Sequence, residues 1–243
     1  MGRASQAAGF LGICLAAAIA TAIAADAPQS HGPAPYPAAM NKKFTAPHVD
    51  IQQFVKRFEN DSRDIYVKRE DILQRVALRS GDAVADIGAG TGLFTLLFAE
   101  RVGNKGVVYA VDISPAFVKY ISERAKQHGH ERIVKTVLNN PGSAELPPAS
   151  IDVAFLCDTY HHFEQPEKML VSIHRALRSG GRMILIDFDL RKDASEYVRQ
   201  RARAPKEVYF REIAAAGFEL IDTKDVPGIR DNFYAEFQRV ERP

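Results

Sequence analysis

Strand-like and helix-like segments alternate along this chain from residue 49, and the alternation limits the fold more than any other feature. The strand candidates are short apolar runs, and the segments between them carry apolar residues at helical spacing. This order predicts βαβ units, and therefore a largely parallel sheet with helices on both faces. The last two strand candidates, 218–226 and 233–240, have too short a link for a crossover helix, so they predict an antiparallel edge hairpin.

The expected fold class is therefore α/β: a Rossmann-like, doubly wound and mostly parallel sheet that ends in an antiparallel C-terminal edge hairpin. Before that hairpin we expect strands over 83–87, 107–111, 133–138, 151–156 and 182–188, and helices over 49–59, 66–76, 93–102, 115–128, 166–177 and 206–216.

Residues 1–24 have the pattern of a secretory signal peptide. Arg3 is the only charge before Asp26, an Ala-rich apolar run covers 10–25, and residues 22–24 match the A-x-A cleavage signature. A membrane-spanning helix usually needs about 20 apolar residues, which favours cleavage over an anchor. The expected location is therefore outside the cytosol, in the periplasm. An uncleaved N-terminal membrane anchor and a misplaced start codon are the alternatives.

The remainder of the chain divides into a linker and one domain. Residues 25–48 are rich in Pro and Ala and predict an extended linker, and 49–243 form the domain. The full chain has 32 Lys and Arg against 30 Asp and Glu. Such a balance argues against a nucleic-acid surface, which needs a concentrated basic footprint. Cys157 is the one cysteine beyond the leader, so no internal disulfide is expected. With the leader cleaved, no stable membrane insertion is expected either.

A glycine-rich turn, Gly88-Ala89-Gly90-Thr91-Gly92, follows the first strand candidate. Glycines allow a sharp turn and let a ligand approach the backbone closely. Leu93 stands where the Gly-x-Gly-x-x-Gly fingerprint needs its third glycine, which counts against a nicotinamide oxidoreductase. Asp86 lies just before the turn, and Asp112 ends the second strand candidate, where a carboxylate can accept both hydroxyls of a ribose.

Four segments resemble, in order, the motifs of class I S-adenosyl-L-methionine (SAM)-dependent methyltransferases. They are Asp-Ile-Gly-Ala-Gly-Thr-Gly at 86–92, Tyr-Ala-Val-Asp-Ile-Ser at 109–114, Ala-Glu-Leu-Pro at 144–147 before Ile-Asp-Val-Ala-Phe at 151–155, and Leu-Arg-Ser-Gly-Gly-Arg-Met-Ile at 177–184. The resemblance covers about 68–190 and is to the small-molecule branch that includes quinone-biosynthesis and arsenite methyltransferases. It implies SAM as cofactor and in-line SN2 transfer of its methyl group to a small molecule.

The resemblance also implies which residues contact SAM. The turn, with Asp86, Gly88, Ala89, Gly90 and Gly92, is expected around the amino-acid part of the cofactor. Asp112 and Ile113 are expected on the ribose side, and Ser143, Ala144 and Glu145 beside the adenine. Many relatives carry an acid where this chain has Ser143, so a hydroxyl replaces a carboxylate as the partner expected for the adenine amino group.

The segment 157–163 follows the fourth strand candidate, at the mouth where a methyl acceptor would lie. His161 or His162 could act as a general base near neutral pH, with Asp158 holding the imidazole or facing the methionine amine. Alternatively, the two histidines only shape the pocket. Consecutive His side chains rarely converge on one ion, so no metal site is expected.

Three further segments could have either a functional role or a purely structural one. Asp187 and Asp189 could border the acceptor site or be solvated loop acids. The segment 63–69 could fold over SAM or be a surface helix. The basic run Arg199–Arg203 is most simply a solvated helix face, although it could also meet an acidic substrate.

Two functions from different classes are consistent with these patterns. One is a SAM-dependent methyltransferase acting on a small-molecule acceptor. The other is a SAM- or nucleoside-binding protein without transfer activity. The enzyme is favoured because a protein that only binds SAM has no need for titratable side chains where an acceptor would lie.

Overall fold

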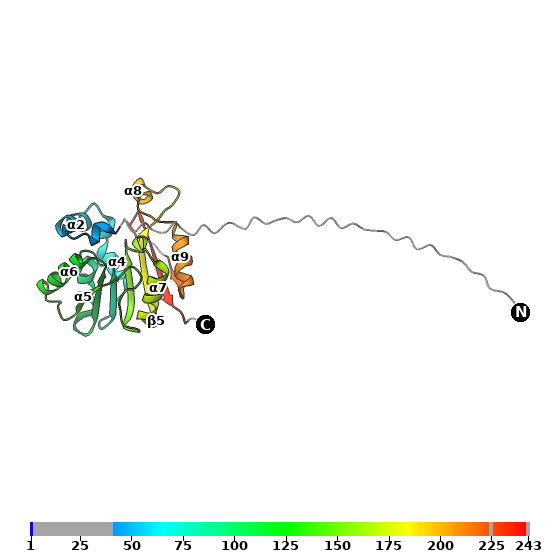
Figure 1. The fold of residues 1–243 in the computed structure, drawn as a ribbon, viewed down its shortest axis with the longest axis horizontal. Helices are drawn as coiled ribbons and strands as arrows, with labels where there is room; N and C mark the ends of the chain where they lie inside the picture. The colour runs from blue at the N-terminus through cyan, green and yellow to red at the C-terminus, as the bar shows by residue number, and fades with distance from the viewer. Residues whose placement is uncertain (2–40, 224–225, 242–243) are drawn as a thin grey trace. The chain divides into compact units, whose positions relative to one another are not determined.

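The computed structural model describes Met1, residues 41–223 and residues 226–241, and the described residues from 41 onward lie in one compact unit (Figure 1). The predicted signal peptide and all but the end of the predicted linker lie outside the described residues. No helix within 41–223 and 226–241 combines the length and the apolar content that crossing a membrane requires.

A seven-stranded sheet with the order β3-β2-β1-β4-β5-β7-β6 forms the centre of this unit. The strands are β1 (Ala83–Ile87), β2 (Val107–Asp112), β3 (Val134–Leu138), β4 (Ile151–Cys157), β5 (Leu177–Phe188), β6 (Phe218–Asp222) and β7 (Asn232–Arg239). All pairs from β3 to β5 are parallel, and β7 is antiparallel to both of its neighbours. The predicted fold class is confirmed. The hairpin docks through β7, which leaves β6 as the edge strand.

Helices cover both faces of the sheet. They are α1 (Lys42–Thr45), α2 (Ile51–Phe58), α3 (Asp64–Val67), α4 (Arg69–Val76), α5 (Leu93–Val102), α6 (Pro115–Gln127), α7 (Pro166–Ala176), α8 (Glu196–Arg199) and α9 (Lys206–Ala215), with 3-10 turns η2 (Gly103–Lys105) and η3 (Tyr160–His162). The alternation of side chains along β4 separates two cores. Val153 and Phe155 pack with α4, α5 and α6, whereas Ala154 and Leu156 pack with α7 and α9.

The topology places a crevice at one end of the sheet. The chain runs outward from β1 to β2 and β3 on one side, and then returns to add β4 on the other side of β1. The connections after β1 and β4 therefore leave in opposite directions, which opens a space beyond the carboxyl ends of these two strands.

Several segments differ from the sequence-based expectation. The helix expected over 66–76 is divided at Lys68 into α3 and α4, and β5 begins at Leu177, before the expected 182. Helix α1 lies inside the segment expected to be linker, so the folded part extends at least to Asn41, whose side chain is buried. Helices α1 and α8 have four residues each, which is too short for an apolar period to be visible in the sequence.

Candidate functional site

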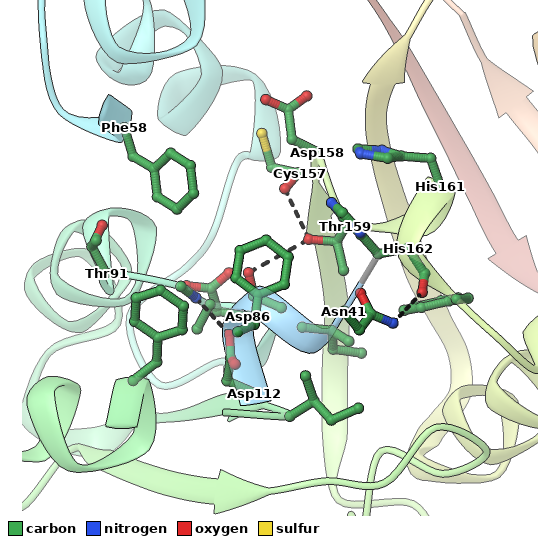
Figure 2. Close-up of a pocket in the computed structure, with 18 of the residues that line it drawn as sticks. Asn41, Phe58, Asp86, Thr91, Asp112, Cys157, Asp158, Thr159, His161 and His162 are labelled. Atoms are coloured by element: carbon green, nitrogen blue, oxygen red, sulfur yellow. Dashed lines mark hydrogen bonds between the residues drawn. The ribbon is translucent and has the colours of Figure 1, made fainter. Parts of the chain in front are cut away.

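A pocket occupies the crevice beyond β1, β2 and β4, and its walls come from segments that are distant in the sequence (Figure 2). The glycine turn and the ends of β2 and β4 form its floor, and α1 and α2 contribute Asn41, Phe44 and Phe58. In Figure 2, Asp86 and Asp112 lie in the lower part of the view, and Asp158 and His161 lie in the upper part. Asp86 and Asp112 therefore lie in one region of the pocket, and Asp158 and His161 lie in another.

The glycine turn has a conformation that side chains resist. Gly88, Gly90 and Gly92 have φ angles of 73°, 56° and 79°, all in the left-handed region. A Cβ on Gly88 would lie 2.3 Å from Cγ2 of Thr159, which follows β4. The amide of Gly88 donates to the carbonyl of Val111 on β2 at 2.8 Å. Close packing between β2 and β4 thus requires glycine here and leaves the backbone of the turn facing the pocket.

The two acids beside the turn are buried and hydrogen-bonded. Asp112 accepts from the amides of Gly90 and Ser114, each at 2.8 Å, and burial raises its pKa to about 6. Asp86 accepts from the hydroxyl of Thr95 at 2.6 Å, and burial raises its pKa to about 7. Both acids line the pocket. Since each carboxylate oxygen can accept more than one hydrogen bond, Asp112 can still accept from a ligand hydroxyl.

The residues that the resemblance predicts beside the adenine do not line the pocket. Ser143, Ala144 and Glu145 are absent from its lining, and Asn139 and Pro141 take that place. The amide of Ala144 donates to Ser172 Oγ at 2.7 Å and its side chain is buried, which holds the segment away from the pocket.

Six of the ten residues predicted to contact the cofactor line the pocket: Asp86, Gly88, Ala89, Gly90, Asp112 and Ile113. Gly92 lies behind the turn, where a Cβ would be 3.0 Å from Ile121. The binding roles themselves stay predictions.

Asp158 lies between an arginine and an asparagine. Its backbone is left-handed, with φ 50°, and its carboxylate forms an ion pair with Arg63 and accepts from Asn232 Nδ2 at 2.5 Å. Burial raises its pKa above the usual range, and the guanidinium of Arg63 opposes that rise. Its two predicted roles, holding the imidazole or facing the methionine amine, stay predictions.

The histidine partner is Asp187, near the end of β5. Its Oδ1 lies 2.8 Å from Nδ1 of His161, and its Oδ2 accepts from the His161 amide at 3.2 Å. Asp187 is completely buried, so it is not the solvated loop acid that was one reading of the sequence. Because the carboxylate accepts the Nδ1 proton, the neutral imidazole has its acceptor lone pair on Nε2. His161 lines the pocket.

His162 has a different chemistry from His161. Burial, assisted by the positive charges of His161, Lys43 and Arg57, lowers its pKa to about 2. Its ring packs edge-on against Phe44 at 5.2 Å, and its carbonyl accepts from Asn41 Nδ2 at 3.0 Å. A base with so low a pKa takes up a proton poorly near neutral pH. Of the two readings made from the sequence, pocket wall fits His162 and general base fits His161.

Aromatic rings cover the pocket near α1 and α2. They were not predicted from the sequence as part of the site. Phe44, Phe54 and Phe117 pack together with ring centroids 5.3 to 6.3 Å apart. Glu59, at the end of α2, accepts two hydrogen bonds from Arg124 of α6, at 2.6 and 2.9 Å. Arg124 also donates to the carbonyl of Thr91 in the glycine turn at 3.0 Å. This ion pair therefore joins the cover to the turn.

Breaking that ion pair tests the connection. We expect Glu59→Gln to lower the free energy of unfolding by about 1–3 kcal/mol, because it leaves a half-buried guanidinium without its charge partner. The measurement is urea denaturation. The control is Glu123→Gln, whose exposed contact with Lys119 is 3.9 Å long and should change stability by less than about 0.5 kcal/mol. Equal effects of the two substitutions would contradict the assigned connection.

Residues 85–185 match the family model described as a methyltransferase domain. A curated relative, the ubiquinone/menaquinone biosynthesis C-methyltransferase UbiE of Marinomonas sp. (strain MWYL1), is 31% identical over 133 residues, which are 55% of this chain and 52% of that protein. The chain thus spans about half the length of the curated relatives it matches.

Solved structures show the same fold. A SAM-dependent methyltransferase from Aquifex aeolicus superposes with a TM-score of 0.68 at 22% identity, covering 79% of this chain and all of that one. A [4+2]-cyclase, SpnF, superposes with a TM-score of 0.62 at 19% identity, covering 75% of this chain and 85% of that one.

Taken with the glycine turn and the strand order, these matches show that residues 85–185 are similar to a methyltransferase domain and that the chain has the fold found in SAM-dependent methyltransferases. SAM is the cofactor that the sequence motifs predict. The pocket fits that cofactor, because a Cβ on Gly90 would enter the space beside Phe58, 3.7 Å from its ring, and Asp112 offers acceptors for a ribose.

Proposed function

We propose that this protein is a methyltransferase that transfers the methyl group of SAM to a small-molecule acceptor deprotonated by His161. The observation that carries the proposal is the buried pair of His161 and Asp187 in the wall of the pocket that holds the glycine turn. SAM, when bound, supplies a methyl group already activated by the positive sulfur. The protein therefore has to orient the acceptor and remove its proton.

The geometry of the pair suits proton removal. With SAM bound, its methyl group would pass from sulfur to the acceptor atom, and Nε2 of His161 would take up the acceptor's proton. The carboxylate of Asp187, 2.8 Å from Nδ1, fixes the tautomer and stabilises the imidazolium that results. The proton then leaves to solvent.

A SAM- or nucleoside-binding protein without transfer activity is the second candidate. The likeness to a [4+2]-cyclase supports keeping it, since the same fold occurs in a protein named for another reaction. The pair of His161 and Asp187 favours the enzyme, because a binding protein gains nothing from a completely buried carboxylate beside a pocket histidine.

Two measurements separate these candidates. Calorimetric titration with SAM should give a dissociation constant in the micromolar range, and absence of binding would contradict both candidates. Screening pools of small molecules for release of S-adenosylhomocysteine should then identify an acceptor. SAM binding with no release from any pool, while wild-type and His161→Ala proteins behave alike, would favour the binding protein.

SAM affinity should depend on pH through Asp112. Its pKa is raised to about 6, so its negative charge is lost as the pH falls through 6. We expect the dissociation constant to be steady above about pH 7 and to rise by up to about tenfold per pH unit below 6, because the ionised carboxylate is the better acceptor for ribose hydroxyls.

Calorimetry between pH 5 and 8 measures this dependence. Asp112→Asn should bind SAM weakly at every pH, and the exposed control Asp193→Asn should follow the wild type. A wild-type dissociation constant that does not change between pH 5 and 8 would contradict this role for Asp112.

We further propose that the protein is exported. The basic start, the apolar run and the A-x-A site of residues 1–24 support this location. Cell fractionation with N-terminal sequencing tests it: the mature protein should be periplasmic and begin at Ala25. Recovery of the full-length chain from the cytosol would contradict export, and full-length chain in the membrane fraction would indicate an anchor.

A further inference from the structure

Three cationic side chains from separate parts of the chain line one side of the pocket. Lys43 lies on α1, Arg57 on α2 and Arg201 just after α8. Figure 1 shows α2 and α8 beyond the same end of the sheet. Arg57 and Arg201 also line an adjoining hollow with Phe188 and Tyr197, a hollow that the glycine turn does not reach. Arg57 and Arg201 therefore lie between the pocket and the adjoining hollow, and Lys43 lies on the pocket side.

Aromatic contacts connect this region to the proposed base. The ring of Phe188 lies 5.0 Å from that of His161, and Tyr197 packs edge-on against Phe188 at 5.7 Å. The guanidinium of Arg201 lies 3.7 Å from the centre of the Tyr197 ring. A molecule bound among the cations could thus place its apolar part along Phe188 and its reacting atom near His161.

The three cations have no carboxylate within 4.0 Å among the described residues. Four acids line the same pocket, and each has another partner: Asp86 bonds Thr95, Asp112 bonds two backbone amides, Asp158 bonds Arg63 and Asn232, and Glu164 bonds Asn41. The pKa of Lys43 is lowered by burial and by the neighbouring positive charges of Arg57 and Arg201. Clustered charges of one sign at a cleft attract ligands of the opposite sign.

We propose that the methyl acceptor is a small organic anion, a carboxylate or a phosphate ester, whose acid group is bound by Lys43, Arg57 and Arg201 while its apolar part contacts Phe188 and Tyr197. This inference rests on the proposed methyltransferase function. The sulfonium of SAM adds one more positive charge to the pocket, which further favours an anionic acceptor over a cationic one. Arg63 is excluded from the acceptor site because Asp158 already neutralises it.

The probes are benzoate, phenyl phosphate and neutral benzamide, titrated by calorimetry into the full-length protein with and without saturating S-adenosylhomocysteine. At least one anion should bind ten times or more tightly than benzamide, and its affinity should fall several-fold between 50 and 300 mM NaCl. The preferred anion distinguishes a carboxylate acceptor from a phosphate ester.

Substitutions assign the binding to the cluster. Lys43→Gln and Arg201→Gln should each weaken the preferred anion by fivefold or more. The control Arg132→Gln removes an equal charge from an exposed position before β3 and should leave the affinity within twofold. Circular dichroism confirms that each variant is folded.

Three outcomes would overturn the proposal. The first is equal affinity, or equal absence of affinity, for the anions and benzamide. The second is an anion affinity that Arg132→Gln lowers as much as Arg201→Gln does. The third is a loss of SAM affinity in the Lys43 and Arg201 variants with anion binding unchanged, which would assign the cluster to the methionine carboxylate of SAM. Absence of SAM and S-adenosylhomocysteine binding would contradict the proposed function instead, and anion binding to the protein without cofactor would still be measurable.

Discussion

Gly88→Ala is expected to raise the dissociation constant of SAM by 100-fold or more. The added Cβ would lie 2.3 Å from Thr159 Cγ2 and 2.4 Å from its Oγ1, so the turn or β4 must move. The residue would also have to keep a φ of 73°, which costs about 1 kcal/mol for alanine. The turn would then no longer present its backbone to the amino-acid part of SAM. Calorimetry with SAM measures the effect.

The chain offers a matched control for this substitution. Gly129 has the same φ of 73°, and a Cβ there would meet nothing within 4 Å. Gly129→Ala should therefore carry the backbone strain without the clash and bind SAM as the wild type does. The double variant Gly88→Ala with Thr159→Gly removes the clashing atoms and should recover part of the affinity. A Gly88→Ala protein that binds SAM within threefold of the wild type would contradict the assigned role of the turn.

His161→Ala should lower kcat by about 10²–10⁴-fold, the range that general-base catalysis contributes, and leave SAM affinity unchanged. Asp187→Asn should lower kcat by about 10²-fold or more, because an amide in place of the carboxylate no longer fixes the Nδ1–H tautomer. Release of S-adenosylhomocysteine with the acceptor found by screening is the assay. SAM affinity separates catalysis from structure, because a variant that has lost its fold would lose SAM binding together with kcat.

Two further histidine substitutions complete this test. His162→Gln should change kcat by less than about tenfold, since its pKa of about 2 makes it a poor base. His128→Gln changes an exposed histidine at the end of α6 and should have no effect. If His161→Ala keeps its kcat, the acceptor is deprotonated elsewhere and this mechanism is wrong.

The strands and the larger helices could be predicted from the sequence because their signals are local. The buried run Ala83–Ile87, the Ser114-Pro115 start of α6 and the glycine beyond α9 each determine nearby backbone geometry. Which strand of the C-terminal hairpin lies at the edge of the sheet could not be predicted in the same way. A short link predicts that β6 and β7 pair, but only packing against β5 decides which of the two becomes the edge strand.

The candidate site divides in the same way. The glycine turn and Asp112 were predicted because each combines a residue type with a position at a strand end, and both line the pocket. Asp158, three positions from His161, was predicted either to hold the imidazole or to face the methionine amine. The carboxylate that lies 2.8 Å from Nδ1 of His161 is that of Asp187, 26 positions away. Pairing of β4 with β5 brings Cys157 opposite Ile186 and so places Asp187 beside His161. The sequence alone does not show that Asp187 and His161 lie close together.

The sequence by itself determined the predicted site of the methyl donor, and the tertiary structure decided the proposed site of the acceptor. A left-handed glycine turn and a strand-terminal acid are properties of short segments, so their chemistry can be recognised before the chain is folded. The base with its carboxylate, and the cations Lys43, Arg57 and Arg201, come from segments that are distant in sequence. They acquire a joint function only when the sheet and the helices above it bring them to one pocket.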